Sequence, residues 1–204
     1  MKRNLVTLIA LAGLTGAALA ASQTFDFKDP KGVNNAVFKL DAVLEAIAGS
    51  ANGISGTVTF DPEHPEATKG KIVVAAESLQ VPNPMMKGHL HGAQWMDVTT
   101  YPEITFEATS LKNVKADGNK ISADAVGTLT LRGVAKAMTV PVTLTYLPDK
   151  LGLRVPNLKG DLLVVRSNFA ISRGDFGINP GAPEDKVSKE INLTLSIAGA
   201  APRP

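Results

Sequence analysis

The chain carries few residues of the types that catalyse reactions. It has three histidines, His64, His89 and His91, and no cysteine. A Ser-His-Asp triad would need one of these histidines, yet no Gly-x-Ser-x-Gly turn exposes a serine nucleophile, and no glycine-rich loop is present to cradle a phosphate. We therefore expect no enzymatic activity and no required cofactor.

The pair His89-x-His91 is the best starting point for a metal site, with His64, Glu45 and Asp97 as further ligands. The pair falls in a segment expected to be helical, where side chains two positions apart point in different directions. A closed zinc site usually takes four ligands. The sequence therefore predicts no metal site, and His89 is kept as a candidate contact for a ligand head group.

Two arginines, Arg132 and Arg173, each have two interpretations. Arg173 belongs to the tripeptide Arg173-Gly174-Asp175, which is known from cell adhesion but is too short to be specific. Paired with Asp175 or Asp124, the arginines would hold strand ends together. At the mouth of a cavity they would instead contact the phosphate of a lipid, so both are candidate head-group residues.

The N-terminal segment has the pattern of an export signal. Lys2 and Arg3 precede an apolar run, residues 5–14, that is too short to cross a bilayer stably, and residues 18–20 (Ala-Leu-Ala) form a small-x-small cleavage pattern. We expect residues 1–20 to be removed and the protein to reach the periplasm or to be otherwise exported, without stable membrane insertion. A retained N-terminal anchor is the alternative.

The remaining chain is short enough for one domain. Without Lys2 and Arg3 the basic and acidic residues are equal in number, which disfavours nucleic acid as a partner. Without cysteine, stability must come from a hydrophobic core. We assign residues 21–197 to the domain and residues 198–204, which are small and proline-rich, to a flexible tail. The sequence leaves a homodimer open.

Most of the chain alternates apolar and polar residues with a period of two, which is typical of half-buried strands. The clearest runs are residues 103–108, 121–131, 138–146 and 190–197. Further strands are expected at 24–28, 36–40, 56–60, 71–76, 151–155 and 161–171. Turn pairs such as Asp117-Gly118 and Arg132-Gly133 separate them. The pattern predicts an all-β domain, either a sandwich or a barrel.

Two segments do not alternate. Residues 84–95 are expected to form a short helix that begins after Asn83, with Pro84 in its first turn. Residues 41–48 fit one or two helical turns with Asp41 as the cap.

Three motifs, in this order and at this spacing, resemble the YceI family of polyisoprenoid-binding proteins. They are His89-Leu90 with Trp95-x-Asp97-Val98 and Tyr101-Pro102-x-Ile104-x-Phe106, then Gly127-Thr128-Leu129-Thr130-Leu131-Arg132-Gly133-Val134, then Phe169-x-Ile171-x-Arg173-x-Asp175-Phe176-Gly177-Ile178. The resemblance covers residues 55–197 well. It departs at Asp41, where many members have His, and at Met86-Lys87, where many have Arg-Asp, so no head-group role is carried over to those positions.

The resemblance implies an extended, lipocalin-like antiparallel barrel of eight strands with a helix at its side and a lumen that takes a long-chain isoprenoid lipid. The implied lumen wall is apolar and mostly aromatic: Trp95, Phe106, Leu129, Leu131, Tyr146, Phe169 and Phe176. Burial contributes about 0.8 kcal/mol per CH₂, so a ten-carbon chain gains about 8 kcal/mol, comparable with an association cost of about 4–15 kcal/mol. Chains of about twenty carbons or more leave a surplus, which favours polyprenyl or isoprenoid quinone tails.

Two alternatives use the same alternation. An outer-membrane barrel would turn its apolar face outward to lipid, although an aromatic share of 5% gives no girdles around the strands. A structural or adhesion module would have a packed interior and no ligand. Packed and hollow interiors require the same alternation, so the pattern alone does not separate them.

Overall fold

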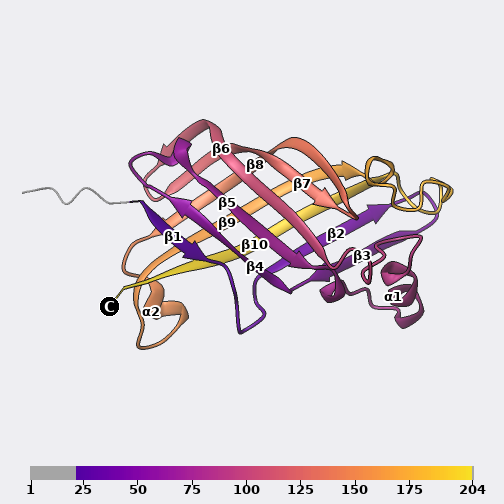
Figure 1. Ribbon diagram of the computed structural model, residues 1–204, viewed down its shortest axis with the longest axis horizontal. Coiled ribbons are helices and arrows are strands. Elements are labelled where there is room, and N and C mark those ends of the chain that lie inside the picture. Colours follow the sequence, from indigo (N-terminus) through magenta and orange to yellow (C-terminus); the bar gives the residue numbers. More distant parts are fainter. Residues whose placement is uncertain (1–21, 204) are drawn as a thin grey trace, which may run out of the picture.

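The described part of the chain, residues 22–203 of a computed structural model, is dominated by strands that form one antiparallel sheet (Figure 1). The segment assigned to the export signal, residues 1–20, lies outside the described residues. In chain order the strands are β1 (Gln23–Asp26), β2 (Asn35–Asp41), β3 (Ala46–Ala51), β4 (Ile54–Phe60), β5 (Lys69–Ala75), β6 (Glu103–Asp117), β7 (Lys120–Leu131), β8 (Val134–Leu147), β9 (Lys159–Ser172) and β10 (Glu190–Arg203).

Eight of these strands close into a barrel. The order β1-β4-β5-β6-β7-β8-β9-β10 returns to β1 where Asp26 pairs with Ala200. Because β1 is short, it covers only one end of β10. The β2–β3 hairpin pairs with the other half of β10, from Asn192 opposite Lys39 to Ser196 opposite Asn35. The prediction of an all-β, eight-stranded antiparallel barrel with a short helical insert is confirmed.

Two short α-helices accompany the strands, α1 (Pro84–His91) and α2 (Leu151–Arg154), together with the 3-10 turns η1 (Pro65–Ala67), η2 (Ala76–Ser78) and η3 (Arg173–Phe176). Helix α1 begins where the sequence predicts. The Asn83 side chain accepts hydrogen bonds from the N–H groups of Met85 and Met86, and Pro84 needs no such partner. Across residues 22–203 no helix is long and apolar enough to span a bilayer.

Two secondary-structure predictions are wrong. Residues 41–48 form the turn and pairing of the β2–β3 hairpin, where Leu40 lies opposite Ile47. Leu40 is buried in the barrel, so tertiary pairing overrides the local capping signal of Asp41. Residues 151–155, expected as a strand, begin with helix α2, whose Leu151 is fully buried against the barrel end.

The flexible tail expected from residue 198 is also wrong. β10 continues to Arg203, which pairs with Lys159 of β9, and Ala201 is buried. The small and proline-rich composition suggested fraying, but the ladder with β9 satisfies the backbone there. The Arg203 side chain also forms an ion pair with Asp161, which ties the end of the strand to the barrel.

The turn between β7 and β8 has the conformation that the sequence predicts. Arg132 and Gly133 have φ values of 50° and 73°, and Leu131 pairs with Val134 across them. Two positive φ values are the signature of the tight two-residue hairpin turn. A Cβ atom on Gly133 would lie 2.5 Å from the ring of Tyr101, so both the backbone and the neighbouring side chain require glycine.

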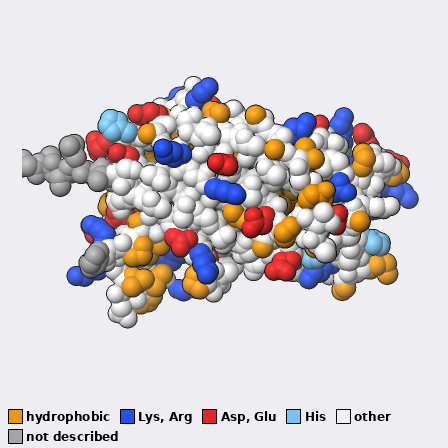
Figure 2. Space-filling view, viewed as in Figure 1, with side chains coloured by type: hydrophobic (Ala, Val, Ile, Leu, Met, Phe, Trp, Pro, Cys, Tyr) orange, Lys and Arg blue, Asp and Glu red, His pale blue; other side chains and the backbone are white. Residues whose placement is uncertain are grey.

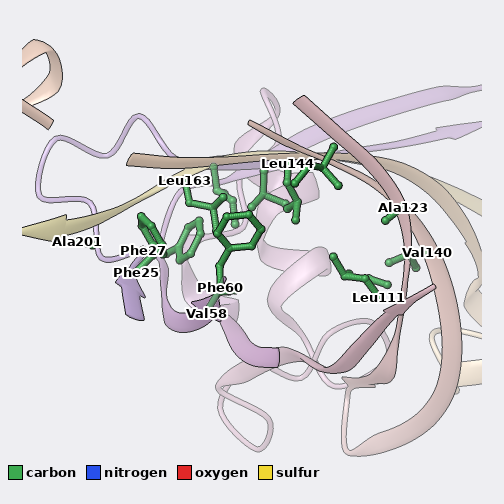
Figure 3. Packing of buried hydrophobic residues seen from close by; sticks show 14 of the residues in the cluster. Phe25, Phe27, Val58, Phe60, Leu111, Ala123, Val140, Leu144, Leu163 and Ala201 are labelled. Carbon is green, nitrogen blue, oxygen red and sulfur yellow. The ribbon is translucent and has the colours of Figure 1, made fainter. Parts of the chain in front are cut away.

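The alternation places the apolar side chains inside the barrel. On β7 the inward residues Ile121, Ala125 and Leu129 are buried, while Ser122 is exposed. One buried cluster begins near α2 with Phe25, Phe60 and Leu163 and continues along the barrel wall to Leu111 and Val140 (Figure 3). A second buried cluster, which includes Phe38, Leu131 and Ile178, lies toward α1. The outer-membrane alternative requires the opposite orientation, with the apolar face outward.

Candidate functional site

Two adjoining cavities occupy the inside of the barrel, with volumes of about 280 Å³ toward α1 and about 180 Å³ deeper in. The same five residues line both of them: Phe38, Leu79, Ile104, Leu129 and Leu193. Because the cavities share this wall, we treat them as one interior space and call it the lumen.

The wall of the lumen is almost entirely apolar. In the deeper cavity the polar exceptions include Thr68 and Ser167, whose hydroxyls donate to the carbonyls of Pro65 and Pro141, each at 2.6 Å. These hydroxyls are therefore already satisfied and offer little to water. A space of this kind favours an apolar chain over a polar ligand.

Side-chain size separates the deeper cavity from the packed end of the barrel. Small residues stand in the wall of the deeper cavity: Ala36, Ala51, Ala108, Ala125 and Ser167. Toward α2 the inward positions carry bulky residues instead, among them Phe25, Phe60 and Leu163, and the space is filled. The same alternation therefore borders open space in the deeper cavity, where several inward residues are small, and a packed segment toward α2, where large residues meet.

Three aromatic rings close the α2 end of the lumen. Phe25 lies 6.3 Å from both Phe60 and Tyr146, ring centroid to ring centroid, and Phe60 lies 5.7 Å from Tyr146. Edge-to-face and tilted contacts at these distances are favourable. Phe25 and Phe60 are almost completely buried. We call these three residues the aromatic plug.

A buried carboxylate holds the plug from behind. Asp161, with 3% of its side chain exposed, accepts hydrogen bonds from the Tyr146 hydroxyl (2.8 Å), Gln23 (2.9 Å) and the Asp149 backbone N–H (2.9 Å), and it pairs with Arg203 (2.6 Å). Burial alone would raise the pKa of Asp161, but these donors hold it below its ordinary value. Burial and the hydrogen bond to Asp161 raise the pKa of Tyr146 to about 12.

The opposite end of the lumen opens beside α1. Residues of the opening come from the β2–β3 hairpin, from α1 and from the loops that follow, and include Glu45, Ile47, Met86, His89, Trp95 and Val187. The ring nitrogen Nε2 of His91 lies 2.8 Å from the carbonyl of Leu79, which ties α1 to the barrel wall. No residue of α1 is fully buried, so the helix flanks the opening without sealing it.

The structure places five of the predicted wall residues in the lumen wall: Trp95, Phe106, Leu129, Leu131 and Phe169. His89, a head-group candidate, lines the opening. Tyr146 lies instead in the aromatic plug, behind the end of the lumen. Phe176 is buried at the end of η3 and lines neither cavity, because the turn after β9 directs it into the packed cluster near α1.

The two arginine candidates do not line the lumen. Arg132 donates to the carbonyls of Gly177 (3.0 Å) and Ala93 (2.7 Å), and its guanidinium lies 5.9 Å from the centre of the Tyr101 ring. Arg173 is buried and donates to the carbonyls of Ile178, Asn179, Ala182, Val187 and Ser188. The predicted pairing with Asp175 or Asp124 is wrong, since all acceptors of the two guanidinium groups in the described part of the chain are backbone carbonyls; through these carbonyls both arginines still hold chain segments together.

Sequence reasoning missed much of the wall. Phe38 and Leu193 lie on strands that the alternation predicts, but only the three-dimensional pairing of β2 with β10 brings them to the same cavity. Val187 comes from a loop without any alternation, so no local signal marked it. The small residues at inward positions were a usable signal for the hollow part.

The histidines do not come together as metal ligands. His64 lies 3.5 Å from Glu66, and His91 contacts a backbone carbonyl. Among residues 22–203, no three His, Asp or Glu side chains are grouped in a way that would hold a metal ion.

Comparisons with known proteins agree with this architecture. The family model described as a YceI-like domain matches residues 22–199. Protein YceI of Salmonella newport (strain SL254) is 32% identical in an alignment 203 residues long that covers 98% of this chain and 98% of that one. Among solved structures, BcnA of Burkholderia cenocepacia has a TM-score of 0.65 at 22% identity, covering 81% of this chain and 95% of that one. A polyisoprenoid binding domain from Saccharophagus degradans has a TM-score of 0.64 at 12% identity, covering 89% of this chain and 100% of that one.

The structural similarities show a shared fold, and the matches in sequence extend over nearly the whole described chain. On this basis the chain belongs to the YceI-like family.

Proposed function

We propose that this protein binds a long-chain isoprenoid lipid, of the polyprenyl or isoprenoid quinone type, inside the lumen, and carries or sequesters it without changing it chemically. The observation that carries this proposal is an apolar space that opens beside α1 and ends at the aromatic plug. Such a space suits a flexible apolar chain that enters by its tail. The polyisoprenoid binding domain from Saccharophagus degradans, which has the same fold, supports this choice of lipid.

The energetics favour a long tail. Each isoprene unit buries five carbons, worth up to about 4 kcal/mol by the transfer scale, against an association cost of about 4–15 kcal/mol. The affinity should therefore rise with each added unit until the tail reaches the plug, and should be constant for longer tails. The head group remains at the opening, where a single exposed contact contributes about 1 kcal/mol or less.

The geometry gives less support to the two alternatives. An outer-membrane barrel needs an apolar exterior, whereas β7 turns its apolar residues inward. A packed module needs a filled interior, whereas the lumen extends from Trp95 at the opening to Val142 in the deeper cavity.

Mass spectrometry of an organic extract tests the proposal directly. Protein purified without detergent should release a polyisoprenoid, and the delipidated protein should bind a ladder of polyprenols with the length dependence described above. Ala125→Leu should reduce binding because the new side chain enters the deeper cavity, while Val126→Leu, one residue along on the outer face, should not. Absence of lipid from the extract, together with no binding at any tail length, would refute the proposal.

We further propose that the protein is exported and released by cleavage after Ala20. The intact mass of the exported protein should then correspond to a chain that begins at Ala21. Recovery of the uncleaved chain in a membrane pellet would contradict release.

A further inference from the structure

Three of the most exposed large apolar side chains stand at the opening of the lumen. Val43, Leu44 and Met85 are 90%, 63% and 74% exposed. Val43 and Leu44 directly precede Glu45, and Met85 directly precedes Met86; both Glu45 and Met86 line the opening. We call Val43, Leu44 and Met85 the apolar rim.

The apolar rim is continuous with the lumen. The backbone N–H of Leu44 donates to the carbonyl of Asp185 at 2.8 Å, which fixes the hairpin turn beside the loop that carries Val187. Val187 and Met86 both line the cavity of the lumen that lies toward α1. An apolar surface therefore runs from the outside of the molecule into the lumen, and hydrophobic side chains are visible at this end in Figure 2.

Charges on the segments around the opening nearly cancel. The acidic residues there are Asp41, Glu45, Glu184, Asp185 and Glu190, and the basic residues are Lys39, Lys87, Lys186 and Lys189. The α2 end is similar, because its loops and strand ends carry Lys28, Lys31, Lys69, Lys120, Lys150, Arg154, Lys159 and Arg203 against Asp26, Asp29, Asp61, Glu63, Glu66, Asp117, Asp149 and Asp161. A surface without a basic surplus matches an uncharged, zwitterionic membrane better than an anionic one.

We infer that the apolar rim inserts into the surface of a phospholipid bilayer, and that the lipid passes between that bilayer and the lumen through this contact. This inference rests on the proposed function, since it names the source from which the same site takes its ligand. An isoprenoid tail that crossed water would expose every carbon during transfer. A rim that enters the bilayer avoids this exposure and should increase the rate of transfer more than the affinity.

The test compares variants at the two ends of the molecule. Val43→Asp/Leu44→Asp and Met85→Asp place charges on the apolar rim, and Leu153→Asp is the matched control because Leu153, on α2, is 83% exposed at the opposite end. All four side chains are exposed, so the fold should not change. Three quantities are measured: flotation with phosphatidylcholine vesicles, the rate of geranylgeraniol uptake from those vesicles, and the affinity for geranylgeraniol in detergent micelles.

The rim variants should take up the lipid from vesicles about tenfold more slowly or worse, because each charge prevents the burial of one apolar side chain. Their affinity in micelles should stay within about twofold of the parent. Leu153→Asp should change neither quantity, and added salt or phosphatidylglycerol should not accelerate uptake. Unchanged uptake by the rim variants, equal slowing by Leu153→Asp, or a strong acceleration by phosphatidylglycerol would each overturn the inference.

Failure of the proposed function has a different result. If the protein binds no lipid from micelles at any tail length but floats with vesicles, and the rim variants do not float, then the lumen is not a lipid site and the apolar rim is still a membrane-docking surface. If the protein binds lipid from micelles but does not float with vesicles, and the rim variants take up lipid at the parent rate, then the lumen is a lipid site and the apolar rim is not a membrane-docking surface.

Discussion

At the α2 end of the barrel, Phe25, Phe60 and Tyr146 fill the space between the strands, and Asp161 holds the tyrosine from behind. At the α1 end the inward residues of the same strands surround a cavity, and the helix beside the opening buries none of its own residues. Both ends are made from strands with one alternation of apolar and polar residues. The first is closed and packed, and the second is open and hollow.

The difference shows that two properties of the sequence act separately. Alternation decides which face of each strand points inward. The volume of the inward residues then differs along the barrel, since Ala108 and Ala125 border the deeper cavity whereas Phe60 and Leu163 fill the packed end. The open space of the deeper cavity therefore coincides with small inward residues, whereas the cavity toward α1 lies between large ones such as Phe38, Leu131 and Ile178.

The largest expected effect comes from truncating the same residue type at each end. Phe60→Ala should lower the free energy of unfolding by about 3–5 kcal/mol, because the ring is packed on all sides and leaves a cavity. Phe169→Ala should cost about 1–2 kcal/mol, because one side of that ring already faces the lumen. Urea denaturation of both variants measures the difference, and equal losses would mean that the two ends are packed alike.

Phe60→Ala should also lengthen the lumen. In a titration with the polyprenol ladder, the tail length at which the affinity becomes constant should increase in this variant, because the plug has lost a ring. Phe169→Ala should leave that length unchanged and weaken binding at every length. An unchanged limit in Phe60→Ala would place the end of the lumen elsewhere.

A second prediction separates two glycines at the α1 end. Gly133→Val should cost about 2–4 kcal/mol, because its φ of 73° is unfavourable for a β-branched residue and its Cβ would meet the ring of Tyr101 at 2.5 Å. Gly92→Val should cost less than about 1 kcal/mol, since Gly92 caps α1 with an ordinary φ of −72°. Equal melting temperatures of Gly133→Val and Gly92→Val would show that the β7–β8 turn does not require glycine at position 133.

Much of the barrel could be predicted because alternation is a local signal that tertiary structure rarely reverses. The runs that become β6, β7, β8 and β10 are examples, as is the cap of α1 at Asn83. The failures occur where a weak local signal competes with long-range contacts. Arg203, in the segment expected to be frayed, pairs with Asp161, and Asp41 ends β2 opposite Ala46 of β3 instead of capping a helix.

The candidate site was less predictable than the fold. Chain order could not show that Tyr146 lies in the plug while Phe169 lies in the wall, because both are aromatic residues at positions expected to face inward. Arg173 is identified by the family motif, but its role follows from the carbonyls that converge on it from the loop of residues 177–189, and those residues show no pattern.

The third prediction concerns the carboxylate at the closed end. Asp161→Asn should lower the free energy of unfolding by about 1–3 kcal/mol at neutral pH, because the Arg203 guanidinium loses its charged partner and hydrogen bonds to a charged group become neutral. Asp175→Asn, an exposed carboxylate at the other end, should change it by less than about 0.5 kcal/mol. Equal changes in the free energy of unfolding of the two variants would show that Asp161 stabilises the closed end no more than an exposed carboxylate does.

The same carboxylate predicts the pH dependence of stability. Because the folded pKa of Asp161 is lowered, its contribution is present above the unfolded value of about 3.9 and is lost as the pH falls through the folded pKa. For Tyr146 the folded pKa is raised to about 12, so its contribution is present below about 10 and is lost at higher pH. In a series of urea denaturations at different pH, Asp161→Asn should lose less stability than the parent as the pH falls below about 4. The same loss in both proteins would show that Asp161 does not cause the loss of stability in acid.

The smallest expected effect lies at the open end and concerns the head group. His89 lines the opening and is exposed, whereas Arg132 is engaged with the carbonyls of Gly177 and Ala93. His89→Ala should therefore change the preference for a polyprenyl phosphate over the matching alcohol by about 1 kcal/mol or less, since an exposed contact with a phosphate is screened by water. Arg132→Lys should leave that preference unchanged, because its charge does not face the lumen. Titration of both variants with the two ligands at one tail length measures the difference. A loss of phosphate preference greater than tenfold in Arg132→Lys would mean that the head group lies against the β7–β8 turn and that the tail enters the lumen from a different side.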